Sequence, residues 1–240
     1  MSHSFTFNNT ASTTYGIHVN NKSVFGAPSR DVSEAIIPGR SGNLLLDNNR
    51  YENFPVKYDC YMVPLTGYTT MLALSKAIKG WLLATNYSYY TLTDTYNPGY
   101  FRKAAFSSQL DIVEVFLSVG KAQINFNCKP FLYLTTGQSV TTLTTPGTVT
   151  NPELFPSYPY IKVTGSGNVT LSIGSASFVL TAISPSIEID SETMNVYRGG
   201  TSLNSKMTSN GFPVFAPGNN AISWTGTVTK LEIIPRWCTL

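Results

Sequence analysis

The chain has 240 residues, a formal net charge of +3 and a charged share of only 12%, which is low for a soluble domain. A surface with so few charges is typical of a protein that contacts other protein. The 16 Lys and Arg residues are scattered along the chain, which argues against the clustered basic footprint of a nucleic-acid-binding protein. No run of apolar residues approaches the ~18 residues of a membrane span, so we expect neither membrane insertion nor sequence-specific binding of nucleic acid.

Short strands are predicted at the start of the chain, at residues 5–7, 15–19 and 23–25, with Asn20-Asn21 as a candidate hairpin turn. Residues 1–7 contain neither the basic nor the apolar region of a signal peptide. We therefore expect the chain to be made and folded in a cytoplasm.

Residues 36–47 predict a hairpin with an arginine at its tip. Pro38 fixes one backbone angle and Gly39 frees the next, so the apolar residues before them should end in a tight turn. Gly42 allows a second reversal, and Arg40 lies between the two as a planar cation with five donors. A contact surface is one interpretation. A plain β-hairpin whose arginine points at water is the other, and this segment alone does not decide between them.

A strand at residues 58–63 is followed by a change of period. Between residues 68 and 84 apolar side chains recur at helical spacing, while Lys76 and Lys79 fall on the other side. Two lysines make only a thin basic face, so we expect this helix to pack against a sheet rather than lie on a membrane.

A second hairpin is predicted around Asn97-Pro98-Gly99, whose proline and glycine suit the corner positions of a turn. Its strands are expected at residues 89–93 and 100–106. Two further strands follow near residues 111–117 and 122–128.

The chain is predicted to contain two domains, residues 1–134 and 151–240. The Thr-, Ser- and Gly-rich stretch 135–150 between them has the composition of a linker. After it helical periodicity does not return, and short strands separated by turns predict a β-sandwich.

The strands of the second domain are predicted at residues 158–163, 168–173, 177–180 and 186–190, with turns at 165–167 and at Gly174. The alternation in the last of these places Ile187 and Ile189 inward, and Glu188 and Asp190 outward. The closing strand repeats the pattern, with Leu231 and Ile233 inward.

Catalytic chemistry has few candidates in this sequence. His3 and His18 match no motif with a nucleophile, and the pair Glu188 and Asp190 shares one strand face instead of flanking a substrate. Cys60, Cys128 and Cys238 are far apart and in no metal-type spacing, so we expect buried, reduced thiols. No glycine-rich phosphate loop leads into a helix. We expect no enzymatic activity, no cofactor and no metal.

One series of motifs extends over nearly the whole chain. It consists, in order, of Pro38-Gly39-Arg40-Ser41-Gly42, a helix ending in Trp81-Leu82, Tyr96-Asn97-Pro98-Gly99-Tyr100, Phe126-Asn127-Cys128-Lys129-Pro130-Phe131, Asn219-Asn220-Ala221-Ile222-Ser223-Trp224 and Ile233-Ile234-Pro235-Arg236-Trp237. This series resembles the distal tail (Dit) proteins of long-tailed, siphovirus-type bacteriophages.

The resemblance implies a mainly β fold. Residues 1–134 would form an N-terminal β-sandwich with one α-helix and a β-hairpin, the ring-forming belt domain, and residues 151–240 a galectin-like β-sandwich. The implied function is that of a structural baseplate hub at the distal end of the tail of the virion. A homohexameric ring would join the major tail tube protein to the tail-associated fibre or lysin protein, with receptor-binding proteins as further candidate partners.

Two exposed turns are the candidate subunit contacts within such a ring. Their residues are Pro38, Gly39, Arg40, Gly42, Tyr96, Pro98, Gly99, Tyr100 and Arg102. Arg40 is expected to donate a charge-assisted hydrogen bond to a neighbouring subunit.

A carbohydrate-binding module that recognises host cell-wall glycans is the alternative function, because galectins bind sugars. Trp224, beside Asn219-Asn220, is the residue that can stack on a sugar ring. Residues 151–240 contain no histidine, which the galectin site uses, and a tryptophan in the core or at the rim of the sandwich is the simpler interpretation.

Overall fold

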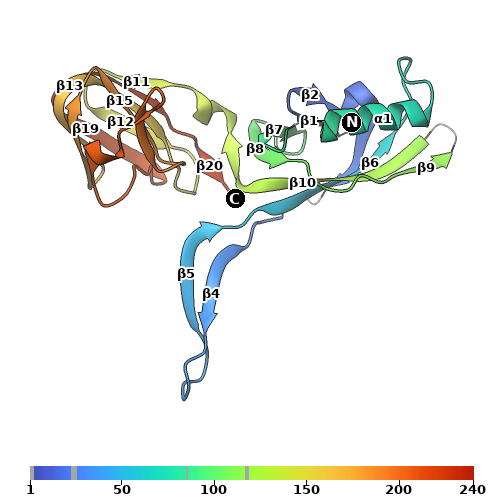
Figure 1. The fold of residues 1–240 in the computed structure, drawn as a ribbon, viewed down its shortest axis with the longest axis horizontal. Helices are drawn as coiled ribbons and strands as arrows, with labels where there is room; N and C mark the ends of the chain where they lie inside the picture. The colour runs from blue at the N-terminus through green and yellow to red at the C-terminus, as the bar shows by residue number, and fades with distance from the viewer. Residues whose placement is uncertain (1–2, 23–25, 85, 117–118) are drawn as a thin grey trace. The chain divides into compact units, whose positions relative to one another are not determined.

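The structure is a computed structural model, and the residues that it describes are 3–22, 26–84, 86–116 and 119–240. The chain divides into two compact units, Met1–Leu132 with Leu240, and Tyr133–Thr239. Strands dominate both units (Figure 1), and α1 (Met71–Leu83) is the only α-helix in the described ranges. The prediction of a mainly β chain with one helix is confirmed.

The sheet of the N-terminal unit runs in the order β2-β1-β7-β8-β10-β6-β3, with β9 beside β10. The strands of this half are β1 (Phe5–Phe7), β2 (Thr10–Ala11), β3 (Ile17–Lys22), β4 (Arg30–Ala35), β5 (Leu44–Tyr51), β6 (Phe54–Met62), β7 (Tyr90–Asp94), β8 (Tyr100–Ala105), β9 (Ile112–Phe116) and β10 (Val119–Leu134). The predicted turn at Asn20-Asn21 is wrong, because both residues lie inside β3, which pairs with β6. The predicted strand at residues 23–25 lies outside the described residues.

Helix α1 forms because its first turn is capped and one of its faces is apolar. The Thr70 hydroxyl accepts a hydrogen bond of 3.2 Å from the backbone N–H of Ala73. The buried side chains of the helix are Met71, Leu74, Ile78, Trp81 and Leu82. They belong to the same core cluster as the buried side chains of the strands, so the predicted packing against a sheet is confirmed.

The central strand pair, β6 and β10, defines the two faces of this sheet. Its antiparallel register runs from Gly120 opposite Met62 to Cys128 opposite Phe54. Side chains along both strands alternate between the core and the outside, because successive residues of a strand point to opposite faces. Phe126 of β10 is fully buried among the aromatic rings of the core.

The C-terminal unit is built on a second antiparallel sheet in the order β11-β19-β13-β15-β16-β17, with β12, β14 and β18 attached to it. Its strands are β11 (Thr141–Leu143), β12 (Gly147–Asn151), β13 (Tyr160–Ile173), β14 (Ala176–Ile183), β15 (Ser186–Asp190), β16 (Asn195–Arg198), β17 (Thr201–Ser202), β18 (Met207–Thr208), β19 (Gly218–Ile234) and β20 (Cys238–Thr239). A separate apolar cluster fills its core.

Residues 135–150, which the composition assigns to a linker, are built into this unit. They contain the 3-10 helix Thr135–Gln138 and the strands β11 and β12, both of which pair with β19. Their many threonines explain the difference, because a β-branched residue suits a strand as well as a loop.

The predicted turn at residues 165–167 is also wrong, because β13 continues through it as a bulged strand. Its register against β19 shifts on both sides of this segment. Gly165 is required there, since a Cβ atom at this position would lie 2.1 Å from the carbonyl oxygen of Thr227.

Asp190 was predicted to face outward, and this prediction is wrong. Arg236 binds both of its carboxylate oxygens, with Nη1 at 2.7 Å and Nη2 at 3.0 Å. Burial by itself raises the pKa of Asp190, but the hydrogen bonds and charge of Arg236 outweigh it and hold that pKa below its ordinary value. The alternation of the strand continues for Ile187 and Ile189, which are buried.

We expect Phe126→Ala to lower the free energy of unfolding by about 3–5 kcal/mol, because it leaves a cavity among packed rings. Leu72→Ala is the matched control, since Leu72 lies on the outer face of α1 with 67% of its surface exposed, and its effect should stay within ~0.5 kcal/mol. Urea unfolding curves measure both values. Equal effects of the two substitutions would contradict this assignment of the core.

Candidate subunit-contact surfaces

Strands β4 and β5 form a hairpin, here called the arm (residues 30–51), that belongs to neither of the two large sheets. Within the described ranges the two strands pair only with each other, from Arg30 opposite Tyr51 to Ala35 opposite Leu44. Figure 1 shows the arm as a two-stranded ribbon that continues into β6. A hairpin of this kind is marginal in water without a partner surface.

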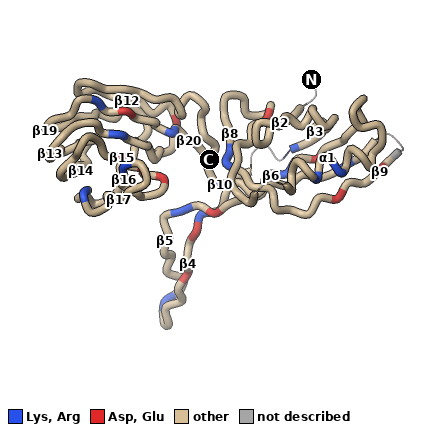
Figure 2. The backbone as a smooth tube through the Cα atoms, turned by 45° about the horizontal axis from the view of Figure 1, so that its top comes forward, with Lys and Arg blue, Asp and Glu red and all other residues tan. Residues whose placement is uncertain are grey.

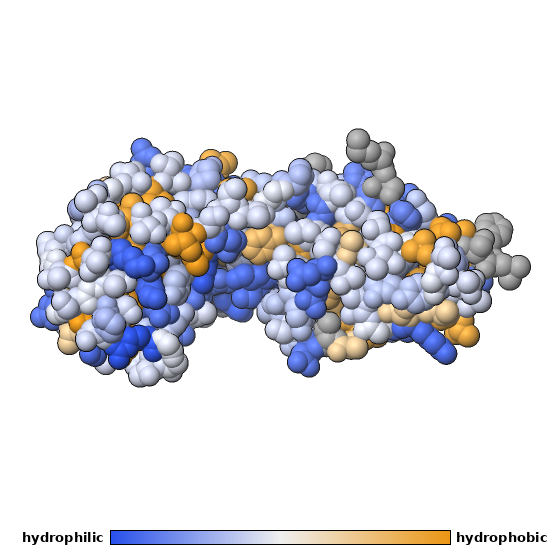
Figure 3. Space-filling view, turned by 90° about the horizontal axis from the view of Figure 1, so that it is seen from above, coloured by the Kyte–Doolittle hydropathy of each residue, from blue (hydrophilic) through white to orange (hydrophobic). Residues whose placement is uncertain are grey.

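The arm carries large apolar side chains in the open. They are Val32, Ile36, Leu44, Leu45 and Leu46, with 82% of Ile36 and 65% of Leu45 exposed. On the face of the molecule seen in Figure 3, by contrast, apolar side chains gather in small groups among polar ones. Exposed apolar residues that follow one another along a single element mark a contact surface.

Two cross-strand ion pairs stabilise the base of the arm. Arg30 forms an ion pair with Asp47, and Arg50 forms one with Asp31. Figure 2 marks basic and acidic positions close together on the strands of the arm near its base. The hydrogen bond from Arg30 is the main reason that the pKa of Asp47 lies below its ordinary value. These four charged side chains are therefore paired with one another within the arm.

The tip of the arm is the turn that the sequence predicts. The backbone N–H of Arg40 donates to the carbonyl oxygen of Ile37 at 3.2 Å, and Gly39 has a φ of 79°, as the third residue of a type II turn requires. Gly42, with a φ of 85°, makes the second reversal. The Arg40 guanidinium is exposed and makes no ion pair or hydrogen bond with any described residue, so its donors are available to a partner.

The second predicted hairpin repeats this turn. The backbone N–H of Tyr100 donates to the carbonyl oxygen of Asn97 at 3.2 Å, and Gly99 has a φ of 84°. Pro98 and Gly99 are exposed, while Tyr96 stacks on the ring of His3 with centroids 4.0 Å apart.

A buried charge cluster holds this hairpin against β3. Lys22 forms an ion pair with Asp94, and only 2% and 7% of the two side chains are exposed. The Tyr58 hydroxyl donates to Asp94 at 2.6 Å, and the backbone N–H groups of Tyr96 and Asn97 donate to its other oxygen. Sequence reasoning missed this cluster, because Lys22 and Asp94 are 72 positions apart and nothing in the local pattern links them.

Arg102 lies in the core of the unit and is absent from the exposed turn. Only 7% of the residue is exposed, and its guanidinium lies 4.9 Å from the centre of the Phe54 ring. Its Nε and Nη1 atoms have no partner among the described residues, and burial lowers its pKa. The burial of Arg102 therefore disfavours the predicted subunit contact through its side chain.

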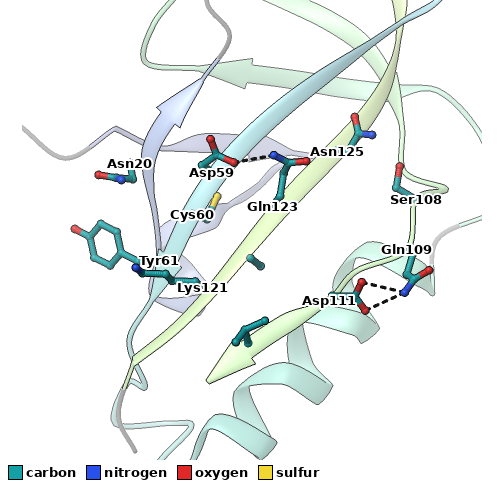
Figure 4. A pocket seen from close by; sticks show the side chains of 12 residues that line it. Asn20, Asp59, Cys60, Tyr61, Ser108, Gln109, Asp111, Lys121, Gln123 and Asn125 are labelled. Carbon is teal, nitrogen blue, oxygen red and sulfur yellow. Dashed lines mark hydrogen bonds between the residues drawn. The ribbon is translucent and has the colours of Figure 1, made fainter. Parts of the chain in front are cut away.

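The outer face of β3, β6 and β10 forms an open polar groove of about 670 Å³ (Figure 4). Gln123 donates to Asp59 at 2.9 Å across β10 and β6, and Gln109 donates to both oxygens of Asp111. The Oδ1 atom of Asn125 is buried there without a partner among the described residues. The groove therefore holds paired amide and carboxylate groups and one buried amide oxygen that is not satisfied by the described residues.

Two strand edges flank this groove. Residues Val119 to Ala122 of β10 pair with β9 along one edge of β10. Along its other edge, β10 pairs with β6 from Gly120 to Cys128. In the described ranges β9 pairs with no strand other than β10. Besides its pairing with β6, β3 makes only one isolated β-bridge, between His3 and Val19. The row β9-β10-β6-β3 thus ends in two different edges that can accept another strand.

The described residues contain no group of three or more His, Cys, Asp or Glu side chains that can hold a metal ion. None of the helices in the described ranges is long and apolar enough to cross a membrane.

Cys60, Cys128 and Cys238 are buried and form no disulfide, as predicted. Burial raises the pKa of Cys60 and of Cys128 to about 12, so neither thiol ionises near neutral pH.

Trp224 is half-buried on β19 and packs against the second core.

No protein-family model and no curated protein sequence matches the chain. Among solved structures it is similar to the Dit protein of phage SPP1, described as a paradigm of the hub adsorption apparatus in phages that infect Gram-positive bacteria. The TM-score is 0.70 over 100% of both chains, at 15% sequence identity. At this identity the likeness establishes the fold, so the chain has a Dit-like fold, as the motif series predicts.

We expect Asp94→Asn to lower the free energy of unfolding by about 3–5 kcal/mol at neutral pH, because it leaves Lys22 buried without a counter-charge. Asp111→Asn is the matched control. Asp111 is an exposed carboxylate on a neutral partner, so its effect should stay below ~0.5 kcal/mol.

The difference in unfolding free energy between wild type and Asp94→Asn should also depend on pH. Burial raises the pKa of Asp94, but hydrogen bonds from Lys22 and Tyr58 outweigh it, and the folded pKa lies below the ordinary value. The stability that ionised Asp94 contributes is therefore complete above the ordinary pKa of an aspartate, about 4. This stability is lost as the pH falls through the pKa of Asp94 in the folded state. Denaturant unfolding from pH 6 to pH 2 should show the gap between wild type and Asp94→Asn narrowing below about pH 4. A gap that stays constant over this range would contradict the assignment.

Proposed function

We propose that this chain is a structural, non-enzymatic component of a bacteriophage tail tip, located at the distal end of the tail of the virion. Six copies form a ring that joins the major tail tube protein to the tail-associated fibre or lysin protein and to the host-adhesion apparatus. The observation that carries the proposal is the likeness to a phage hub protein over the full length of both chains.

The contact surfaces support a ring. A closed ring of identical subunits needs two different complementary surfaces on each copy. The edges of β9 and β3 are two such surfaces, because strand edges associate through backbone hydrogen bonds. Each seam should bury at least ~1,600 Å² in total.

The arm supplies a third contact of a different kind. Its exposed aliphatic side chains, among them Ile36 and Leu45, gain stability when a neighbour covers them. Arg40 at its tip has free donors that fit a carboxylate or a backbone carbonyl. In the proposed ring the arm of one subunit therefore lies on the next subunit.

The ring itself is tested by native mass spectrometry and negative-stain images of the purified chain over a concentration series. We expect particles of six subunits with a central opening, in increasing proportion as the concentration rises. A monomer at every concentration, together with a monomeric copy in intact virions, would contradict the proposal.

We expect Arg40→Ala to weaken the ring, because each seam loses a charge-assisted hydrogen bond, which typically changes an association constant about tenfold or more. The midpoint of dissociation on dilution should shift accordingly, and its dependence on salt should decrease. Lys79→Ala, which removes one exposed charge from α1, is the control and should leave the midpoint unchanged. If both variants dissociate like the wild type, Arg40 is not a contact residue.

A further inference from the structure

A second cavity, of about 180 Å³, lies within the C-terminal unit and is lined by two cations. Its polar lining consists of Arg198, Lys206, Ser184 and Ser186, and the remaining lining side chains are aliphatic. No carboxylate lines it. The volume is several times the ~30 Å³ that a water molecule occupies in the liquid, so a small polyatomic ion fits.

The walls of this cavity are tied to one another. The Lys206 ammonium donates to the carbonyl oxygen of Ala182 at 3.1 Å, and the Thr181 hydroxyl donates to the carbonyl oxygen of Lys206 at 3.3 Å. The backbone N–H of Leu203 donates to the carbonyl oxygen of Val196 at 2.7 Å. Three separate segments are therefore held in place before any ligand arrives, which reduces the entropy lost on binding.

Apart from the bond from Lys206 to Ala182, the side-chain donors of the cavity lining are unused. Arg198 makes no ion pair, and the hydroxyls of Ser184 and Ser186 make no hydrogen bond with the residues that the structure describes. The acidic neighbour Glu188, on β15, is engaged by the Tyr160 hydroxyl at 2.9 Å and by the backbone N–H of Gly199 at 3.5 Å. It is not part of the cavity lining, so the two positive charges are not neutralised there.

We propose that this cavity binds a tetrahedral oxyanion, namely a phosphate or sulfate group. The guanidinium of Arg198 suits two oxygens of such a group, Lys206 adds a point charge, and the two serine hydroxyls donate to the remaining oxygens. A planar carboxylate has fewer oxygens and uses fewer of these donors. The site lies on residues 182–206, which the proposed ring does not use, so it is independent of the proposed function.

Equilibrium dialysis of the full-length chain against labelled inorganic phosphate and labelled sulfate tests the proposal. We expect saturable binding of one ion per chain for both. Unlabelled acetate at equal ionic strength should displace them less effectively than unlabelled phosphate, and chloride should not displace them. Absence of saturable binding, or equal displacement by chloride, would overturn the proposal.

Substitutions assign the bound ion to the cavity. Arg198 is exposed on a strand end, so Arg198→Ala should fold normally and weaken phosphate binding about tenfold or more, with Arg198→Lys in between. Lys230→Ala is the control, because it removes the same charge from the same unit at a lysine that is paired with Glu232. Equal losses in Arg198→Ala and Lys230→Ala would show binding by net charge alone and refute the site.

Discussion

The antiparallel pairing of β6 with β10 is the constraint on which the N-terminal unit depends. A shift of β10 by one residue against β6 would bring the outward Gln123 into the core and turn Phe126 to the outside. The same alternation that fills the aromatic core thus creates the polar groove on the opposite face. It also fixes where the arm begins, because β5 leads into β6 through two residues only.

The buried pair of Lys22 and Asp94 connects this sheet to the second hairpin. It joins the end of β3 to the end of β7, and the same carboxylate receives the backbone N–H groups that open the turn. A charge pair so well covered from water contributes more to a defined arrangement than to net stability. The turn with Pro98 and Gly99 is consequently presented in one orientation at the surface.

Local signals in the sequence were sufficient for much of this fold. The two Pro-Gly turns, the amphipathic helix and the inward isoleucines of β15 each depend on residues close in the chain, and each is found where it was predicted. The features that were missed depend on distant residues. Asp190 is turned into an ion pair by Arg236, and Gly165 permits the approach of Thr227, which no local periodicity reveals. The turn at the arm tip has the predicted geometry, but its role as a subunit contact stays a prediction.

The charges at the base of the arm have a consequence for a single chain whose arm is uncovered. Aliphatic side chains on an uncovered hairpin are a template for disordered aggregation. Arg30, Asp31, Asp47 and Arg50 border that aliphatic stretch as gatekeepers, and strands of another chain that stack there must bury or break their ion pairs. In the proposed ring, these charges would therefore protect a newly made chain from aggregation until its arm is covered by a neighbour.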